Sequence, residues 1–412
     1  MRASKAALLG AVVLASIASA DERFLLASGE GGELSASTRQ GLAWEWRDLR
    51  VRLGGRFHLD AAIFDDDRTR LKNDLDVRRG RLQLRVRYGD DWRLRVDREF
   101  ADESGSDSRG WRNVWLRWTP LRKVQLQVGN FIAPLGLESL GSSNTISFLE
   151  RALPSVLAPG FQTGAMLAAR GRLGDTRRRH HWTFAVFGGI EPFGVEENDT
   201  KRSEHVSFAS RLTYAPWAEN RRVLHLGAAV EYRDNDHRSR YRVRTRPESF
   251  LAEPLLSTGR LREVDEVTTF GAEAGGIYGP FSLQGEYLQS WLSRPSRSRS
   301  RPDPTFHGWY VQGSWVVTGE SKRYSRSRGV FGGVRPKARW GAVELAVRVS
   351  ALDLNDETVR GGSATDITLG ANWYLRENVR LMFNYVNVES KQRRTRRSDD
   401  PHLFLFRFAV FL

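Results

Sequence analysis

The stretch Arg81–Arg98, RLQLRVRYGDDWRLRVDR, alternates between apolar and polar side chains on both sides of a short connection. Before the connection, leucines 82 and 84 and Val86 share one face, while arginines and a glutamine share the other. After it, Trp92, Leu94 and Val96 repeat the pattern. A period of two with one apolar face is typical of a half-buried β-strand. A soluble sandwich would show the same alternation, so the connections must decide the architecture.

Short and long connections alternate along the rest of the chain. The short ones are 88–91, 119–123, 171–181, 215–220, 278–280 and 375–379. The long, polar ones lie around 65–73, 101–110, 131–160, 190–203, 234–263, 293–305, 354–362 and 390–401. This alternation is typical of an antiparallel barrel that crosses the outer membrane, with tight periplasmic turns and longer outer loops. The segment 318–340 is an exception, because it is long where a periplasmic turn is expected.

Counting strands between these connections predicts an all-β fold, a transmembrane antiparallel β-barrel of about 16 strands spanning 49–412. The predicted strands are 49–64, 74–88, 91–100, 111–119, 123–131, 161–172, 181–190, 204–215, 222–233, 264–278, 281–292, 306–318, 340–353, 363–375, 379–389 and 402–412. The last one, HLFLFRFAVFL, alternates aromatic and apolar residues with polar ones and resembles the recognition signal for barrel assembly in the outer membrane.

The first 48 residues are predicted to lie outside the barrel. Residues 1–20 combine a basic start, an apolar run and a small-residue site, which predicts a secretory signal peptide. Residues 21–48 alternate more weakly and are expected to form an N-terminal periplasmic segment. Beyond residue 20 no apolar run reaches about 18 residues, which argues against membrane-spanning helices. The chain has no cysteine, so disulfides and thiolate metal sites are excluded.

The net charge of +15 comes almost entirely from arginine, because lysine occurs only at positions 5, 72, 123, 201, 322, 337 and 391. Arginine is permanently charged and presents a planar fork that suits phosphate and carboxylate oxygens. The composition therefore points to anionic partners. A genome biased towards arginine codons would give the same composition, and both readings stay open.

Several separated blocks of the chain resemble the phosphate-selective porins O and P. They are LGGRFHLDAAIFDDD (53–67), DVRRGRLQLRV (76–86), VGNFIAPLGLESLGSSNTISFLERALP (128–154), APGFQTG (158–164), YVQGSWVVTGE (310–320) and ANWYLRENVRLMFNYVNV (371–388). The resemblance implies a sixteen-stranded, homotrimeric barrel. It also implies that the third loop, 131–160, folds inward and narrows the pore as a constriction loop.

The resemblance also suggests site residues that bind anions at the constriction. Arg78 and Arg79 match the paired arginine of the family, and Arg56 is a further candidate. Strand alternation allows only one of two neighbours to face the lumen, unless both lie at a bulge or a strand end. Ser142 and Ser143 match a Ser-Ser pair whose hydroxyls can donate to an anion. Solvated lumen arginines and ordinary turn chemistry in GSSN are the alternatives.

Two further positions concern the same loop. Glu150 and Arg151 are expected to anchor it to the barrel wall rather than to contact ions. Ser139 stands where phosphate-selective members of the family carry a lysine. That difference leaves a preference for anions in place and weakens the case for phosphate.

These observations predict passive diffusion of inorganic anions, phosphate or polyphosphate and chloride, through the outer membrane of a bacterium. Outer-membrane lipid and lipopolysaccharide are the expected surroundings, and no nucleic acid, cofactor, metal or catalytic residue is expected. The pair His180–His181 lacks a third ligand that would indicate a metal site. The alternatives are a general, non-selective porin, an outer-membrane barrel enzyme, and a basic periplasmic binding protein. The last of these leaves the apolar faces and the loop alternation unexplained.

Overall fold

The computed structural model describes residues 23–37, 41–101, 110–174, 180–191, 205–219, 221–235, 241–295, 302–392 and 397–412. The predicted signal peptide lies outside the described residues. No helix in the described part of the chain is long and apolar enough to cross a membrane.

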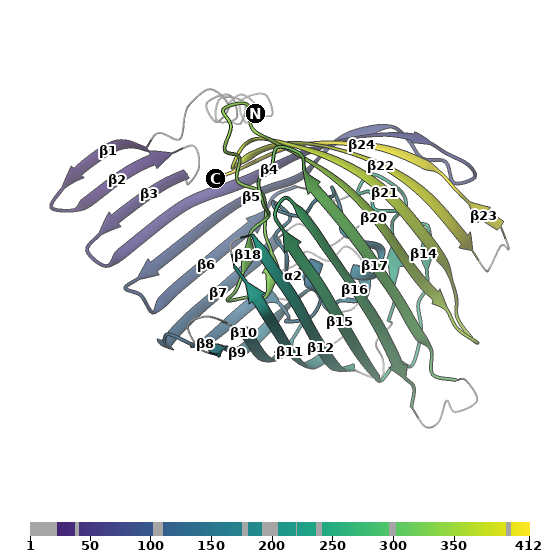
Figure 1. Ribbon diagram of the computed structural model, residues 1–412. Helices are drawn as coiled ribbons and strands as arrows, with labels where there is room; N and C mark the ends of the chain where they lie inside the picture. The colour runs from purple at the N-terminus through teal and green to yellow at the C-terminus, as the bar shows by residue number, and fades with distance from the viewer. Residues whose placement is uncertain are drawn as a thin grey trace.

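A closed, antiparallel barrel of sixteen strands forms the body of the molecule (Figure 1). Its strands are β4 (Leu49–Asp65), β5 (Asp74–Tyr88), β6 (Trp92–Glu99), β7 (Gly110–Leu121), β8 (Val124–Ile132), β9 (Phe161–Leu173), β10 (His180–Ile190), β11 (His205–Ala218), β12 (Arg222–Asn235), β15 (Glu266–Tyr278), β16 (Phe281–Ser293), β17 (Thr305–Val316), β20 (Ala342–Asn355), β21 (Arg360–Arg376), β22 (Val379–Gln392) and β24 (His402–Phe411). The last strand closes the barrel by pairing with the first, from Asp65–His402 to Arg56–Phe411. The predicted fold class is confirmed, and the strand ends agree with the prediction to within a few residues.

The barrel is apolar on its outer face and charged inside, the reverse of a soluble protein. In β20, Leu345 and Val347 are 45% and 47% exposed, while their inward neighbours Glu344 and Arg348 are fully buried. The alternation that the sequence shows therefore separates an outer apolar surface from a polar lumen, as in barrels that span a membrane. A soluble sandwich, which buries its apolar faces, is excluded.

Three loops enter the lumen. The constriction loop is observed at 133–160, because Phe131 and Ile132 end β8, and it carries α2 (Leu137–Leu140) and η1 (Leu153–Leu157). The segment 241–265, which contains β13 (Arg244–Thr245) and β14 (Leu256–Ser257), packs its apolar side chains with those of η1. The loops are thus held inside by an apolar core that they share with inward side chains of the barrel wall, among them Leu288 of β16 and Phe306 of β17.

Another loop that enters the lumen, residues 317–341, accounts for the long connection found where a short turn is expected. It joins β17 to β20 and carries the short hairpin of β18 (Tyr324–Ser325) and β19 (Val330–Phe331). It enters from the end of the barrel where the other connections are short, and we call it the inner loop. Its Tyr324 hydroxyl lies 2.8 Å from Nδ1 of the inward-facing His225 of β12. The long connection is therefore built into the lumen.

The N-terminal segment forms strands of its own rather than an irregular tail. β1 (Arg23–Gly29), β2 (Gly32–Ser37) and β3 (Gly41–Trp46) pair antiparallel in chain order, and β3 pairs with Leu49–Leu53 of β4. They extend the barrel sheet beyond its closing seam, as Figure 1 shows at the purple end of the chain. The periplasmic location of this segment stays a prediction.

Candidate functional site

A β-bulge in β5 brings both neighbouring arginines into the lumen. Arg79 lies opposite His58 and Val77 lies opposite Leu59, so Arg78 has no opposite residue in β4. An extra residue in one strand breaks the alternation locally, which is the exception that the sequence left open. Arg78 forms an ion pair with Glu150. Arg79 is 8% exposed, and its buried Nε has no hydrogen-bond partner among the described residues.

The two serines of the constriction loop make different contacts. Ser143 Oγ accepts a hydrogen bond from Arg56 Nη1 at 2.8 Å, and both side chains are largely buried. Ser142 Oγ accepts only from the Asn144 amide at 3.3 Å, which is local turn chemistry. Arg56 Nε is buried without a hydrogen-bond partner in the described structure. Arg56 and Arg79 therefore hold donors with spare hydrogen-bonding capacity among the described residues, next to Ser143 of the constriction loop.

Glu150 connects the constriction loop to the wall, whereas Arg151 connects the loop to itself. Glu150 accepts from Arg78 Nε at 2.7 Å and from Arg407 Nη2 of β24 at 2.7 Å. Burial opposes its ionisation, but Arg78, Arg407 and Arg79 outweigh burial and hold the pKa of Glu150 well below its usual range. Arg151 donates to the carbonyl oxygens of Glu138, Ser139 and Gly141 at 3.0 to 3.3 Å.

Three arginines of the barrel wall hold the loop by its backbone, and the sequence did not single them out. Arg348 donates to the Glu150 carbonyl at 3.0 Å, Arg380 to the Ile146 carbonyl at 2.8 Å, and Arg407 to the Leu149 carbonyl at 2.5 Å. All three face inward from β20, β22 and β24 and are essentially buried. A lone arginine among the apolar and aromatic residues of β24 is a signal that could have found Arg407, whereas β20 and β22 carry other polar residues and give no such signal for Arg348 and Arg380.

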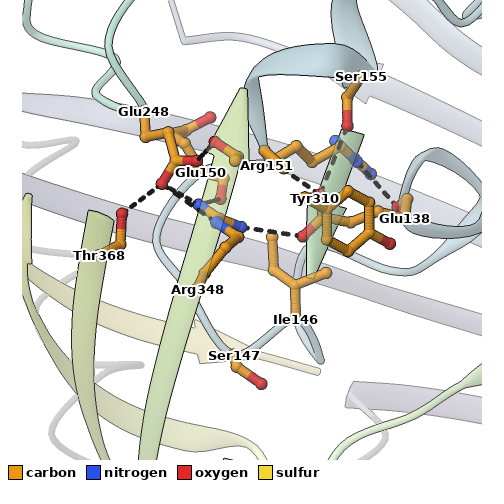
Figure 2. Close-up of polar contacts among 12 residues, drawn as sticks. Glu138, Ile146, Ser147, Glu150, Arg151, Ser155, Glu248, Tyr310, Arg348 and Thr368 are labelled. Atoms are coloured by element: carbon orange, nitrogen blue, oxygen red, sulfur yellow. Dashed lines mark hydrogen bonds and ion pairs between the residues drawn. The ribbon is translucent and has the colours of Figure 1, made fainter. Parts of the chain in front are cut away.

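Figure 2 shows Arg348 between two carboxylates that come from different loops. Its Nη1 donates to Glu138 of the constriction loop at 3.1 Å, and its Nε donates to Glu248 of the segment 241–265 at 3.1 Å. Glu248 also accepts from Thr368 Oγ1 of β21 at 2.5 Å. The guanidinium lies 4.2 Å from the ring centre of Phe148. One arginine therefore ties two loops to the wall.

Three further acidic residues of the wall contact the loops or a group that holds them. Glu286 of β16 accepts from the Leu137 amide at 2.7 Å. Glu344 pairs with Lys322 of the inner loop at 2.9 Å. Glu273 pairs with Arg211, whose guanidinium also donates to the Gly329 carbonyl of the inner loop at 2.7 Å. These three carboxylates are thereby covered by, or paired with, groups that hold the loops in place.

The opposite side of the lumen presents many arginines to a cavity of about 730 Å³, and four of them, Arg78, Arg81, Arg95 and Arg211, form ion pairs with carboxylates outside the lining. Within the described residues its lining contains no aspartate or glutamate. Its cations are Arg56, Arg78, Arg79, Arg81, Arg95, Arg112, Arg117, Arg122, Lys123, Arg151, Arg170, Arg211 and Arg328. Burial and the charges of Arg95 and Arg211 lower the pKa of Arg328 on the inner loop. The cavity runs from the constriction loop towards the short-turn end, where Arg122 and Lys123 form the β7–β8 turn.

Two other predicted features lie outside this cavity. Ser139, at the position where a lysine is expected, is buried within α2 and its carbonyl accepts from Arg151. His180 Nδ1 lies 2.6 Å from the Tyr214 hydroxyl. No group of three or more potential protein metal ligands occurs among the described residues.

A closed barrel with an apolar exterior, a charged lumen and an inward-folded loop is an outer-membrane porin. The chain belongs to the phosphate-selective porin O and P family, whose model matches residues 51–411. Porins are channels rather than enzymes, and this membership excludes the barrel-enzyme alternative.

Known proteins agree with this assignment. Porin O of Pseudomonas aeruginosa is 25% identical over 408 residues, which cover 90% of each chain. Among solved structures, the anion-selective porin of Comamonas acidovorans is similar at a TM-score of 0.53, with 13% identity over 88% of this chain and 99% of that one. OmpT of Vibrio cholerae is similar at 0.52, with 12% identity over 89% of this chain and 98% of that one. At these identities the two structures support the fold alone.

Proposed function

We propose that this porin conducts inorganic anions in preference to cations, with phosphate or polyphosphate as favoured solutes and chloride also conducted. The observation that carries the proposal is the cavity beneath the constriction loop, lined by arginines and a lysine with no carboxylate among the described residues. A low-dielectric wall of one sign concentrates counter-ions in the passage. Such a passage admits anions and repels cations.

Arg56, Arg79 and Ser143 are proposed as the groups that replace part of the hydration shell of the anion. The buried Nε atoms of the two arginines lack partners, and charge-assisted hydrogen bonds to a phosphate oxygen would satisfy them. Conduction requires binding that is strong enough to dehydrate the ion and weak enough to release it. Arg78 is the weaker candidate for this role, because Glu150 accepts hydrogen bonds from its Nε and Nη2.

A general anion porin is the second candidate, and one observation favours it. Ser139 is buried in α2, so the loop does not supply the lysine seen in phosphate-selective relatives. The charge of the cavity would then attract anions without a strong preference for phosphate. Homotrimeric assembly, contact with lipopolysaccharide and removal of residues 1–20 on export belong to the same proposal; a trimer form of Vibrio cholerae OmpT is known.

Planar-bilayer recordings test the proposal. Reversal potentials across a KCl gradient report the anion preference, and block of the chloride current by added phosphate reports phosphate binding. We expect anion selectivity and block at millimolar phosphate. A preference for potassium would contradict the anion channel, and a chloride current that phosphate leaves unchanged would leave the general anion porin.

A further inference from the structure

Part of the wall of the cation-lined cavity is apolar, which is unusual for a water-filled lumen. Trp115 of β7, Phe131 at the end of β8, and Phe161 and Met166 of β9 all line it. The register places Trp115, Met166 and Phe131 at inward positions, opposite Gly129, Gln127 and Gln162, and Phe161 lines the cavity from the first position of β9. A channel for small hydrated ions alone has no use for these side chains.

This apolar wall is rigidly packed rather than a chance group of rings. The ring of Phe187 lies on two glycines, because a Cβ on Gly189 or Gly164 would come within 2.2 or 2.8 Å of it. Phe131 meets Phe187 edge to face at a centroid distance of 5.4 Å, and Trp115 and Met166 pack against this pair. The buried part holds the root of the constriction loop, while Trp115, Phe161 and Met166 stay partly exposed to the cavity.

Positive charge borders the apolar wall directly. The Arg117 guanidinium lies 4.7 Å from the ring centre of Trp115, and that of Arg112 lies 5.4 Å from the ring centre of Phe161. Arg56 and Arg79 line the same cavity from β4 and β5. A solute that carries both an anionic group and an apolar ring can therefore contact both kinds of wall at once.

We propose that this cavity is a binding subsite for aromatic organic anions, of the aryl phosphate and aryl carboxylate class. The inference rests on the proposed anion conduction and names the solutes that the channel holds best. The anionic group binds the arginines, and the ring covers the exposed faces of Trp115, Phe161 and Met166. Inorganic phosphate uses the arginines alone, because a fully hydrated ion gains nothing from an apolar surface.

The test compares phenyl phosphate with inorganic phosphate as blockers of the chloride current through the full-length protein in planar bilayers. Partial burial of one ring predicts half-block at a concentration about tenfold lower for phenyl phosphate. In Trp115→Gln, and separately in Phe161→Gln, this advantage should fall to about twofold or less. Trp118→Gln is the matched control, because Trp118 lies on the same strand but stacks on Trp92 on the outer face. It should keep the full advantage.

Equal block by the two compounds in the wild-type protein would overturn the inference while leaving anion conduction intact. An advantage that survives both lumen variants would also overturn it, since the ring would then bind elsewhere. If one of the two lumen variants does not insert into the bilayer, the block measured with the other variant tests the inference. A preference for cations in KCl would remove the proposed function as well, and the reversal potential recorded in the same experiment distinguishes the two failures.

Discussion

The two sides of the lumen carry opposite charge and use it differently. On the acidic side, Glu273, Glu286 and Glu344 are each bonded to a group that holds a loop or to the loop itself. On the cationic side, Arg56 and Arg79 keep buried Nε atoms that have no hydrogen-bond partner in the described part of the chain. Fixed charge therefore serves structure on one side and remains available to a solute on the other. In the proposed anion channel, the loops neutralise part of the wall and leave these arginines available to a solute.

Removing an ion pair that holds the loops should have the largest effect of the changes considered. Arg348→Met leaves Glu138 and Glu248 buried without their shared partner, and loss of one member of a buried ion pair costs about 3 kcal/mol or more. We expect a lower unfolding temperature, measured by the heat-dependent mobility of the folded barrel in gels, together with a larger single-channel conductance as the loop loosens.

Arg360→Met provides the comparison for that experiment, because Arg360 is exposed at the first residue of β21. Its unfolding temperature should match that of the wild-type protein. An equal loss of stability in the two variants would contradict the role of Arg348 as the shared tie of two loops.

Reversing a charge on the cationic side of the lumen should change the ion selectivity of the channel rather than its stability. Arg79→Glu places a carboxylate beside Arg78 and Arg81, whose charges are already balanced by Glu150 and Glu99, and the ratio of anion to cation permeability should fall about tenfold or more. Reversal potentials in KCl gradients measure this ratio. Arg98→Glu is the control, because Arg98 lies beside Trp111 and opposite the outward-facing Leu82. Similar changes in the two variants would place the selectivity outside the constriction.

The sequence predicts the barrel well because strand alternation and loop length are local properties. β5, for example, is observed at Asp74–Tyr88, as the alternation predicts. The contacts inside the lumen are not local. Arg407 meets Glu150 across 257 positions of the chain, and Lys322 meets Glu344 only because the inner loop turns back into the barrel. The bulge in β5 does leave a mark, because the apolar positions change from odd (Leu75, Val77) to even (Leu82, Leu84), but its place at Arg78 is fixed only by the pairing with β4.

A smaller effect should separate the two serines of the constriction loop. Ser143→Ala removes the hydroxyl that accepts from Arg56, so Arg56 loses its position, and half-block by phosphate should need a concentration about threefold to tenfold higher. Ser142→Ala removes only a weak contact within the turn and should shift the block less. Titration of phosphate against the chloride current measures both. A larger effect at Ser142 would contradict the assignment of Ser143.

The smallest effect is expected from acidification, which acts on the ion pairs of Glu150 with Arg78 and Arg407. These pairs join the constriction loop to the barrel wall. The pKa of Glu150 is held below that of an unfolded glutamate, about 4.3. Its ion pairs therefore contribute fully above that pH, and the contribution is lost only as the pH falls through the lower folded pKa. The ion pairs of Glu150 should therefore hold the constriction loop in place from neutral pH down to about 4.5. On further acidification these pairs should break, and the single-channel conductance should rise.

The readout is the difference in single-channel conductance between the wild-type protein and Glu150→Gln across a pH series. Burial raises the pKa of Glu138, so that carboxyl titrates at a higher pH, but it does so in both proteins. The variant should already conduct more at neutral pH, and the difference between the two proteins should shrink only on the acid side of about 4.3. If the conductances of the two proteins became equal in the pH range where free histidine titrates, a group other than Glu150 would be responsible for holding the loop.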